Sequence, residues 1–433
     1  MNYLDCTIPI DSPWVLVPYL TNNEYNSYKI TKIKGALTNV IYKLSIFDDG
    51  ICTNYLVRIF GSKMNSLVDR KDELKNIQKV PEEVGSVKIL LPFRNGRVEK
   101  FLDGFKSLSQ REMVSEPFFK VIAHKFSILH FQSPKPDKSD INRFKDGFAW
   151  TKIEQWLSII ESPLTNDWLQ RNNGYNLKTF VLSKDWSRFK KIIAKYKEWV
   201  LSDYSNTNNS IVFCHNDTQQ GNILVEKNTC YNQEPNIKFI DYEYSGPNFI
   251  AFDLSNFLTE CMHDYNVNST QSYRCLKSRY PSQEKILTFL SSYLCHKKDN
   301  KSKETIRVEE LKILYNQVIK WRGVTQLFWA LWAILQSGGL INPSTCNDMD
   351  QNDEYDVETL SSDLIEEDSN NHSNYSTSEV SNDINKNDDY FDYMNFCKDK
   401  LSFFWGDLIK FRIATKDDCI MEDVQYLDIN LIP

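Results

Sequence analysis

The 433-residue sequence predicts an α+β fold in two lobes, a small β-rich N-terminal lobe and a larger, mainly helical C-terminal lobe. Two observations support this expectation. Residues 28–104 alternate apolar and polar side chains as strands do, and after Gly104 apolar residues recur at three- and four-residue steps, as in helices. The length also exceeds what one compact core usually holds. We therefore expect one lobe over residues 1–104 and another over 105–433.

The small lobe is expected to be a sheet carrying one helix. Residues 40–46 alternate in hydrophobicity, and residues 53–61 are rich in β-branched and aromatic side chains. Asn95-Gly96 and Gly104 are turn signals. Between the strands, residues 66–80 have helical character, and Pro81 would end that helix.

The large lobe should contain mostly helices and two short buried strands. Phe119, Ile122, Phe126 and Leu129 have helical spacing after Pro117. The strands are expected at residues 211–214 and 237–240. Residues 342–389 are rich in Asn, Asp, Ser and Glu and poor in apolar side chains, so they are expected to form a disordered loop within this lobe.

Charge and cysteine usage restrict the classes of function. Residues 346–392 hold 15 acidic residues and one lysine, so this segment has a net charge of −14. Because the whole chain has a net charge of −7, the rest of the chain has a net charge of +7. That surplus is too diffuse for a nucleic-acid groove. The ten cysteines are scattered without metal-site spacing, which favours free thiols in a reducing compartment.

The sequence predicts no stable membrane insertion and a cytoplasmic location. The N-terminus lacks a basic start followed by an apolar run, and the longest apolar stretch, residues 327–335, is too short to span a bilayer. Oligomeric state is left open, with a homodimer as one alternative.

One constellation of polar residues suits phosphoryl transfer. Asp217 and Asn222 are five residues apart in a loop between apolar runs, and Asp241 ends the second run nineteen residues after Asn222. In kinases, an Asp near the acceptor hydroxyl, an Asn a few residues on and a second Asp perform base and metal-binding roles at such spacing. Asp217 is therefore the candidate base, and Asn222 and Asp241 are candidate Mg²⁺ ligands.

The wording of these segments resembles the choline/ethanolamine kinase family. It reads Cys-His-Asn-Asp-Thr-Gln-Gln-Gly-Asn-Ile-Leu from Cys214, then Ile-Asp-Tyr-Glu-Tyr-Ser-Gly-Pro-Asn-Phe-Ile-Ala-Phe-Asp-Leu-Ser-Asn from Ile240. The similarity extends from Gly35 to about Trp405, apart from the acidic loop, and is nearer to choline kinases. It implies a two-lobed protein-kinase-like fold with ATP between the lobes.

The resemblance also implies residues that bind the nucleotide. The family's phosphate-binding loop corresponds to Gly35, Ala36, Leu37, Thr38, Asn39, Val40 and Ile41, although Ala36 replaces a family Gly and restricts the backbone. Arg58 corresponds to the basic residue that reaches the phosphates, with Glu73 placed to pair with it. Lys100 and Leu102 lie in the implied hinge for adenine, and Gln219 is expected to face the nucleotide.

For the acceptor, the resemblance points to a carboxylate and four aromatic residues, namely Glu260, Tyr265, Trp329, Trp332 and Tyr393. Two tryptophans three residues apart on a helix share a face, and aromatic faces attract cations. Periodicity alone equally fits a stripe of core aromatics. Asn268 replaces a family acid, which would weaken the negative charge of the pocket.

Together these resemblances imply Mg²⁺-dependent transfer of the ATP γ-phosphate to choline, giving phosphocholine and ADP for phospholipid synthesis. The near alternative is ethanolamine as acceptor. More distant alternatives are an aminoglycoside or sugar kinase, which would share the two Asp and the Asn but not the tryptophan pair, and a choline-binding pseudokinase. The joint presence of base, metal ligands and Arg58 argues against the last.

Overall fold

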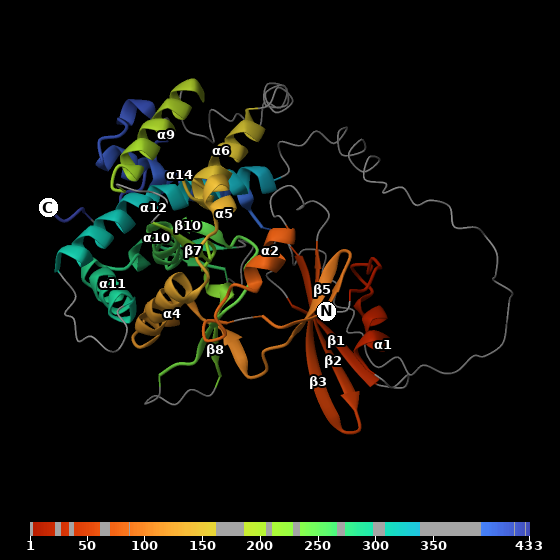
Figure 1. Ribbon diagram of the computed structural model, residues 1–433. Helices are drawn as coiled ribbons and strands as arrows, with labels where there is room; N and C mark the ends of the chain where they lie inside the picture. The colour runs from red at the N-terminus through yellow and green to blue at the C-terminus, as the bar shows by residue number, and fades with distance from the viewer. Residues whose placement is uncertain are drawn as a thin grey trace.

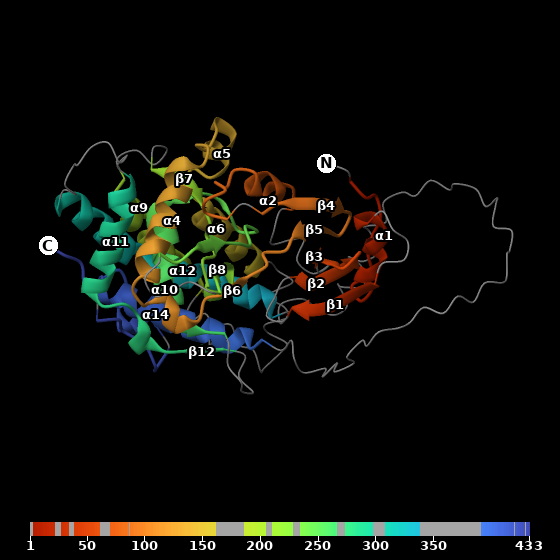
Figure 2. The same ribbon diagram turned by 90° about the horizontal axis from the view of Figure 1, so that it is seen from below.

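The computed structural model describes residues 3–21, 27–33, 39–60, 70–85, 87–161, 186–204, 210–227, 234–265, 273–297, 308–337, 391–419, 421–428 and 430–433. Residues 35–38 of the expected phosphate-binding loop, Asn268 and the acidic segment 342–389 lie outside these ranges. The N-terminal sheet, with helix α1 (Val17–Leu20) beside it, and most of the helices after residue 104 occupy opposite sides of the molecule in both ribbon views (Figure 1, Figure 2). The predicted α+β fold with a β-rich N-terminal part is confirmed, whereas the expected division after residue 104 stays a prediction.

The N-terminal lobe is built on a five-stranded antiparallel sheet of order β1-β2-β3-β5-β4. Its strands are β1 (Ser27–Ile33), β2 (Asn39–Asp48), β3 (Ile51–Phe60), β4 (Ile89–Phe93) and β5 (Gly96–Lys100). Helix α2 (Arg70–Ile77) lies within the helical range expected before Pro81. Two short helices, η1 (Pro13–Leu16) and α1 (Val17–Leu20), precede the sheet.

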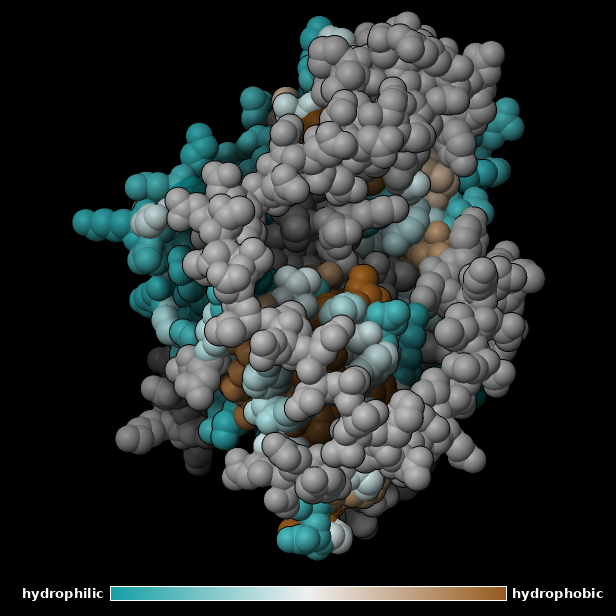
Figure 3. Space-filling model, turned by 90° about the vertical axis from the view of Figure 1, so that its right-hand side faces the viewer, coloured by the Kyte–Doolittle hydropathy of each residue, from teal (hydrophilic) through white to brown (hydrophobic). Residues whose placement is uncertain are grey.

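Alternation along the strands gives this lobe a core of its own. One cluster of buried side chains joins the sheet to the N-terminal helices; it contains Ile8, Leu16, Val17, Leu44, Ile46, Val57, Ile59, Leu91, Phe93 and Val98. Outward-facing apolar residues remain on the same lobe, among them Tyr19 and Ile51, which are 56% and 67% exposed. Figure 3 looks onto this side and shows hydrophobic atoms near its centre beside hydrophilic ones.

The C-terminal lobe packs its helices around α12 (Val308–Gln336), which contacts α6 (Phe148–Ile160), α10 (Ile250–Glu260) and α14 (Tyr393–Lys410). Residues of α12 from Val318 to Ile334 are almost all buried, as expected of a helix at the centre of a lobe. The other helices are α3 (Gln110–Met113), α4 (Phe118–Gln132), α5 (Lys138–Arg143), α9 (Trp186–Leu201), α11 (Gln283–Lys297), η5 (Lys277–Arg279) and η6 (Lys416–Asp418).

Short strands position the loops that carry chemistry. β7 (Ile211–Cys214) pairs with β10 (Gly246–Phe249), and β8 (Ile223–Glu226) lies between β6 (Phe105–Ser107) and β9 (Ile237–Phe239). The strands expected at 211–214 and 237–240 are therefore present. Because Ile223 opposes Phe239, the start of β8 lies beside the end of β9. A separate pair joins β11 (His263–Asp264) to β12 (Arg274–Cys275).

Within the described residues, none of the helices combines the length and the apolar character needed to cross a lipid bilayer.

Candidate active site

Asp253 of α10 fixes the backbone of the loop that follows β7. Its Oδ2 accepts the N–H of His215 at 2.8 Å, and its Oδ1 accepts the N–H of Asn216 at 2.8 Å. Asn216 has a φ of 66°, a conformation that Asn tolerates better than most residues. The side chain of Asn216 donates to the carbonyl of Tyr244 at 2.9 Å. These bonds define where the next residue, Asp217, projects.

His215 is a structural residue of this loop. Its Nε2 lies 2.9 Å from the carbonyl of Ile240, and its Nδ1 accepts the backbone N–H of Asp217 at 3.3 Å. Burial lowers the pKa of the imidazole despite the nearby Asp253, so the ring is neutral.

The Asp217 carboxylate meets the predicted Asn222 directly. The Asn222 amide donates to Asp217 Oδ2 at 3.0 Å and to the Asp217 carbonyl at 2.9 Å, across η4 (Gln220–Asn222). Burial, followed by the charges of Asp241, Glu260 and Glu243, raises the pKa of Asp217 well above its usual value. Several carboxylates therefore converge here, and such a cluster favours bound cations.

Asp241 follows β9 and lies beside Asn222, because the N–H of Ile240 donates to the Asn222 carbonyl at 3.0 Å. Asp241 has a φ of 67°, which turns the chain sharply at the end of the strand. Its Oδ1 accepts a bond from Arg58 Nη1 at 2.9 Å. The structure thus joins the two lobes through the residues predicted for the metal and for the phosphates.

Glu73, which was expected to pair with Arg58, pairs with a different arginine. Glu73 Oε1 instead accepts from Arg97 Nη2 at 2.7 Å, while Arg58 pairs with Asp241 and, at 3.7 Å, with Glu99. Glu99 also binds Arg97 Nε at 2.5 Å. Arg58 and Arg97 are opposite each other on β3 and β5, so two buried arginines share the neighbouring acids. Because Glu73 is satisfied by Arg97, it holds Arg58 only indirectly.

The oxygen atoms at this site fit a magnesium ion, which prefers carboxylate and carbonyl-type oxygens. Asn222 uses its amide nitrogen toward Asp217, which leaves Oδ1 with only a long 3.4 Å contact from Gln219. Asp241 adds a carboxylate from the neighbouring strand end. Glu243, two residues later, accepts a 3.2 Å bond from Asn39 at the start of β2. Asn222 and Asp241 are thus suited to the metal role that the sequence assigned.

The remaining predicted nucleotide residues that the structure describes lie near strand ends and beside η4. Asn39, Val40 and Ile41 begin β2, Lys100 ends β5 and is exposed, and Leu102 is half-buried just after it. Gln219 accepts the N–H of Gly221 at 2.6 Å and so caps η4. The nucleotide contacts of these residues stay predictions.

A second group of residues, of types that often bind metals, supports the loop that follows β7. His130, Cys214 and Asp253 are the group of described His, Cys and acidic residues whose ligand atoms lie within 4.8 Å of one another. His130 already contacts Asp253 at 3.0 Å and the Tyr293 hydroxyl at 2.9 Å. Burial raises the pKa of the Cys214 thiol well above its usual value, and a protonated thiol is a poor metal ligand. We interpret this group as a hydrogen-bonded support.

Aromatic rings gather where the acceptor pocket is expected. Trp329 and Trp332 are 5.5 Å apart between ring centroids, and Trp332 is 5.6 Å from Tyr393 at the start of α14. Their indole N–H groups bond inside the lobe, Trp329 to Asn256 at 2.7 Å and Trp332 to the Tyr244 hydroxyl at 2.8 Å. Both indole N–H groups therefore have partners within the lobe.

Tyr265 joins this aromatic group through two phenylalanines that sequence reasoning missed. Its ring centroid lies 6.4 Å from Phe391 and 6.5 Å from Phe396, while Phe391 is 4.9 Å from Tyr393 and Phe396 is 6.3 Å from Trp332. All four predicted aromatic residues thus belong to one continuous group.

Glu260 ends α10 beside these rings, but its carboxylate is already engaged. Oε1 accepts from Lys400 Nζ at 2.7 Å and Oε2 from the Tyr265 hydroxyl at 2.8 Å. Burial opposes ionisation of Glu260, yet Lys400, His263 and Tyr265 hold its pKa below the usual value. The charge that the sequence assigned to the pocket is therefore paired with a buried ammonium.

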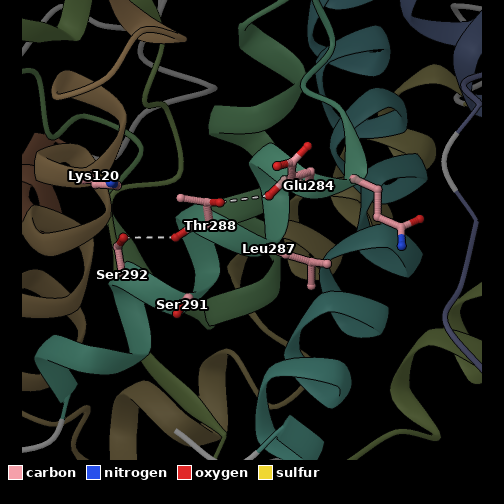
Figure 4. A pocket seen from close by; sticks show the side chains of 7 residues that line it. Lys120, Glu284, Leu287, Thr288, Ser291 and Ser292 are labelled. Carbon is pink, nitrogen blue, oxygen red and sulfur yellow. Dashed lines mark hydrogen bonds between the residues drawn. The ribbon is translucent and has the colours of Figure 1, made fainter.

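A cavity of about 700 Å³ lies elsewhere, along one side of α11 (Figure 4). It is lined by Lys120 of α4 and by Glu284, Leu287, Thr288, Ser291 and Ser292 of α11, with Gln283 at the helix start. Several of its polar side chains bond to their own helix, as Thr288 does to the Glu284 carbonyl at 3.0 Å. None of the predicted site residues lines it, so it is not the candidate active site.

Four acids and bases of the site were not assigned from the sequence: Glu99, Glu243, Asp253 and Lys400. A signal existed for the first two. Arg97 and Glu99 are two residues apart on one strand and so share a face, and Glu243 follows Asp241 at the same spacing. Asp253 and Lys400 sit within helices, and their roles depend on tertiary contacts that no local pattern contains.

Comparison with known proteins identifies relatives along most of the chain. The sequence model described as choline/ethanolamine kinase matches residues 30–405. The chain is 36% identical over 423 residues to the ethanolamine kinase of Saccharomyces cerevisiae, covering 94% of this chain and 75% of that protein. It is 30% identical over 444 residues to the choline kinase of the same yeast, covering 90% and 72%. The first of these two is the more similar, although the sequence reading placed the chain nearer choline kinases.

A solved structure shares the fold. The choline kinase of Cryptosporidium parvum aligns with a TM-score of 0.60 at 20% identity, covering 90% of this chain and 92% of that one. The ethanolamine kinase of Plasmodium vivax aligns with a TM-score of 0.56 at 23% identity, covering 74% and 79%.

Proposed function

Because the chain belongs to the choline/ethanolamine kinase family, we propose that it transfers the γ-phosphate of ATP to the hydroxyl of choline, giving phosphocholine and ADP. One observation carries the proposal. Asp217 is bonded to Asn222 on the metal-binding side of the site. On the acceptor side, the preceding Asn216 donates to the carbonyl of Tyr244, whose hydroxyl accepts the indole N–H of Trp332. A base in this position can reach a hydroxyl whose cationic end rests on the aromatic group.

On the nucleotide side, the chain's own residues neutralise and orient the phosphates. Arg58 is buried, and although burial disfavours its charge, Asp241, Glu99, Glu73 and Glu243 raise its pKa, so it stays cationic. Asn222 and Asp241 would hold Mg²⁺, which when bound supplies further neutralisation of the phosphate charge. Residues 35–41 are the proposed cradle for the phosphates.

On the acceptor side, Asp217 accepts the hydroxyl proton while the aromatic group holds the cation. Positioning the two reactants in this way removes much of the entropic cost of their encounter. A quaternary ammonium carries no N–H and gains from aromatic faces, whereas a primary ammonium needs hydrogen-bond acceptors. The Glu260 carboxylate already accepts bonds from Lys400 and Tyr265, so the aromatic rings contribute most of the attraction for the acceptor's cation. This favours choline.

Ethanolamine is the second candidate acceptor, and one observation favours it. The yeast ethanolamine kinase shares 36% identity with this chain and the yeast choline kinase 30%. The carboxylates around Asp217 would also accept hydrogen bonds from a primary ammonium.

The test is ADP formation from ATP and Mg²⁺ with choline, with ethanolamine and without acceptor. We expect both amines to stimulate ADP release and choline to give the higher kcat/KM. A higher value for ethanolamine would transfer the assignment to the second candidate. No stimulation by either amine would contradict the proposed function altogether.

A second prediction concerns Trp332→Ala. Loss of one aromatic face at a desolvated cation removes about 0.5–2 kcal/mol, so we expect the KM for choline to rise about twofold to thirtyfold while the KM for ATP stays near the parent value. Trp332→Phe, which keeps a ring, should show a smaller rise. Trp14→Ala, at a tryptophan 44% exposed on the N-terminal lobe, is the matched control. Equal increases in the KM for choline and the KM for ATP would show that Trp332 acts as a structural core residue and not as a choline contact.

A further inference from the structure

A lysine without solvent exposure lies in α14, beside the aromatic group. The Lys400 side chain is 0% exposed. Its Nζ donates to Glu260 Oε1 at 2.7 Å and lies 4.8 Å from the centroid of Phe396, one of the rings that join Tyr265 to Trp332. A buried ammonium is costly unless it is paired, and Glu260 supplies that partner.

Glu260 links Lys400 to the predicted acceptor residues, because its carboxylate bonds to both Lys400 and Tyr265. Its second oxygen accepts the Tyr265 hydroxyl at 2.8 Å, which fixes the ring of a predicted acceptor residue. The other titratable neighbour is His263, whose Nδ1 lies 3.9 Å from Glu260. Burial, followed by Lys400, lowers the pKa of His263 to about 4, so this ring is neutral near pH 7. The pair therefore has no net charge.

We propose that Lys400 is a positioning residue that sets acceptor preference, because it neutralises Glu260 and holds the carboxylate against Tyr265, leaving an uncharged wall suited to a quaternary ammonium. A free carboxylate at the same place would form a hydrogen-bonded ion pair with a primary ammonium, which choline cannot do. The inference rests on the proposed function, since it names what makes the acceptor site choose between two amines.

The direct test is Lys400→Met, which keeps an unbranched apolar side chain and removes the charge. We expect the ratio of kcat/KM for ethanolamine to kcat/KM for choline to rise about tenfold, because Glu260 then faces the substrate cation without a cationic partner of its own. In Lys400→Met combined with Glu260→Gln both charges are absent, and the ratio should return to within about threefold of the parent. A neutral pair in place of a buried ion pair is generally compatible with folding.

Lys398→Met is the matched control, since Lys398 is exposed on the same helix. It should leave the ratio unchanged. A merely structural role for Lys400 would lower both activities together and would not be reversed by Glu260→Gln. An unchanged ratio in folded Lys400→Met, or a shift that persists in the double variant, would overturn the inference.

Glu260→Gln alone removes the negative charge of the pair instead of the positive one. It provides the test if Lys400→Met fails to fold. It leaves the ammonium unbalanced beside the cation site, so the KM for both amines should rise about tenfold while the KM for ATP does not change. Unchanged KM values for both amines would refute the role of the pair. Absence of amine-stimulated ADP release in the parent would instead refute the proposed function, so the two failures are distinguishable.

Discussion

Asp217→Asn is expected to lower kcat by about 10²–10⁴-fold while ATP binding stays close to that of the parent. The amide cannot accept the proton of the acceptor hydroxyl, and a positioned general base contributes a factor of this size. Asn222 keeps its bond to the Asp217 carbonyl, so the loop retains one of its two contacts.

The same substitution should not destabilise the protein, and this separates a catalytic role from a structural one. In the folded state, burial and the charges of Asp241, Glu260 and Glu243 raise the pKa of Asp217. An acid whose pKa is raised on folding destabilises the native state at pH values above its unfolded pKa, so a neutral amide should leave the Tm equal or higher at pH 7.

Steady-state kinetics, nucleotide titration and thermal unfolding of this variant give the answer. Asp423→Asn, at an exposed position near the C-terminus, is the matched control and should behave as the parent. Parent-like turnover in Asp217→Asn would remove Asp217 from the base role, and a Tm several degrees lower would mean that the carboxylate mainly supports the loop.

The fold was predictable because its signals are local. Alternation in residues 40–46 and helical spacing after Pro117 reflect which side chains face a core, and the structure forms β2 and α4 there. The candidate base and metal ligands were predictable for a similar reason. Asp217 and Asn222 lie in one short loop before β8, and Asp241 follows β9. The pairing of β8 with β9 therefore brings them to one edge.

Pairing between charges was not predictable in the same way. Glu73 lies on a helix and both arginines lie on strands, so spacing does not decide which arginine it meets. The register of β3 and β5 decides it, since that register places Arg58 opposite Arg97 and lets Glu99 lie between them. Lys400 resembles a surface lysine in its local sequence. It is buried because α14 packs against α12 and because its ammonium bonds to Glu260 at the end of α10.

Asp253→Asn should lower both activity and stability. Asp253 accepts two backbone N–H groups of the catalytic loop and contacts His130. An amide presents one oxygen and an NH₂ group, so at least one donor in a fully buried site loses its acceptor. Leaving a buried donor unsatisfied costs about 1–3 kcal/mol, and more where a charged acceptor is removed, so we expect a loss of about 3 kcal/mol in the free energy of unfolding.

The catalytic effect follows because the two bonds fix the backbone immediately before Asp217. A displacement of about 1 Å in a reacting group can cost 10²-fold in rate, so we expect kcat to fall by about that factor. Denaturant unfolding and kcat are the measurements. Asp203→Asn is the matched control, because Asp203 pairs with Lys320 near the surface and should contribute less than about 1 kcal/mol.

Asp217→Asn and Asp253→Asn are thus both expected to lower turnover, but only Asp253→Asn is expected to lower stability. If Asp253→Asn kept parent-like kcat despite its lower stability, the loop would hold Asp217 without this carboxylate, and the bonds from Asn222 and Asn216 would have to be sufficient. If instead it lost turnover without losing stability, Asp253 would act on the reacting groups themselves. That outcome conflicts with its position, because its oxygens bond to the backbone of His215 and Asn216 and to His130 rather than to any group facing the acceptor.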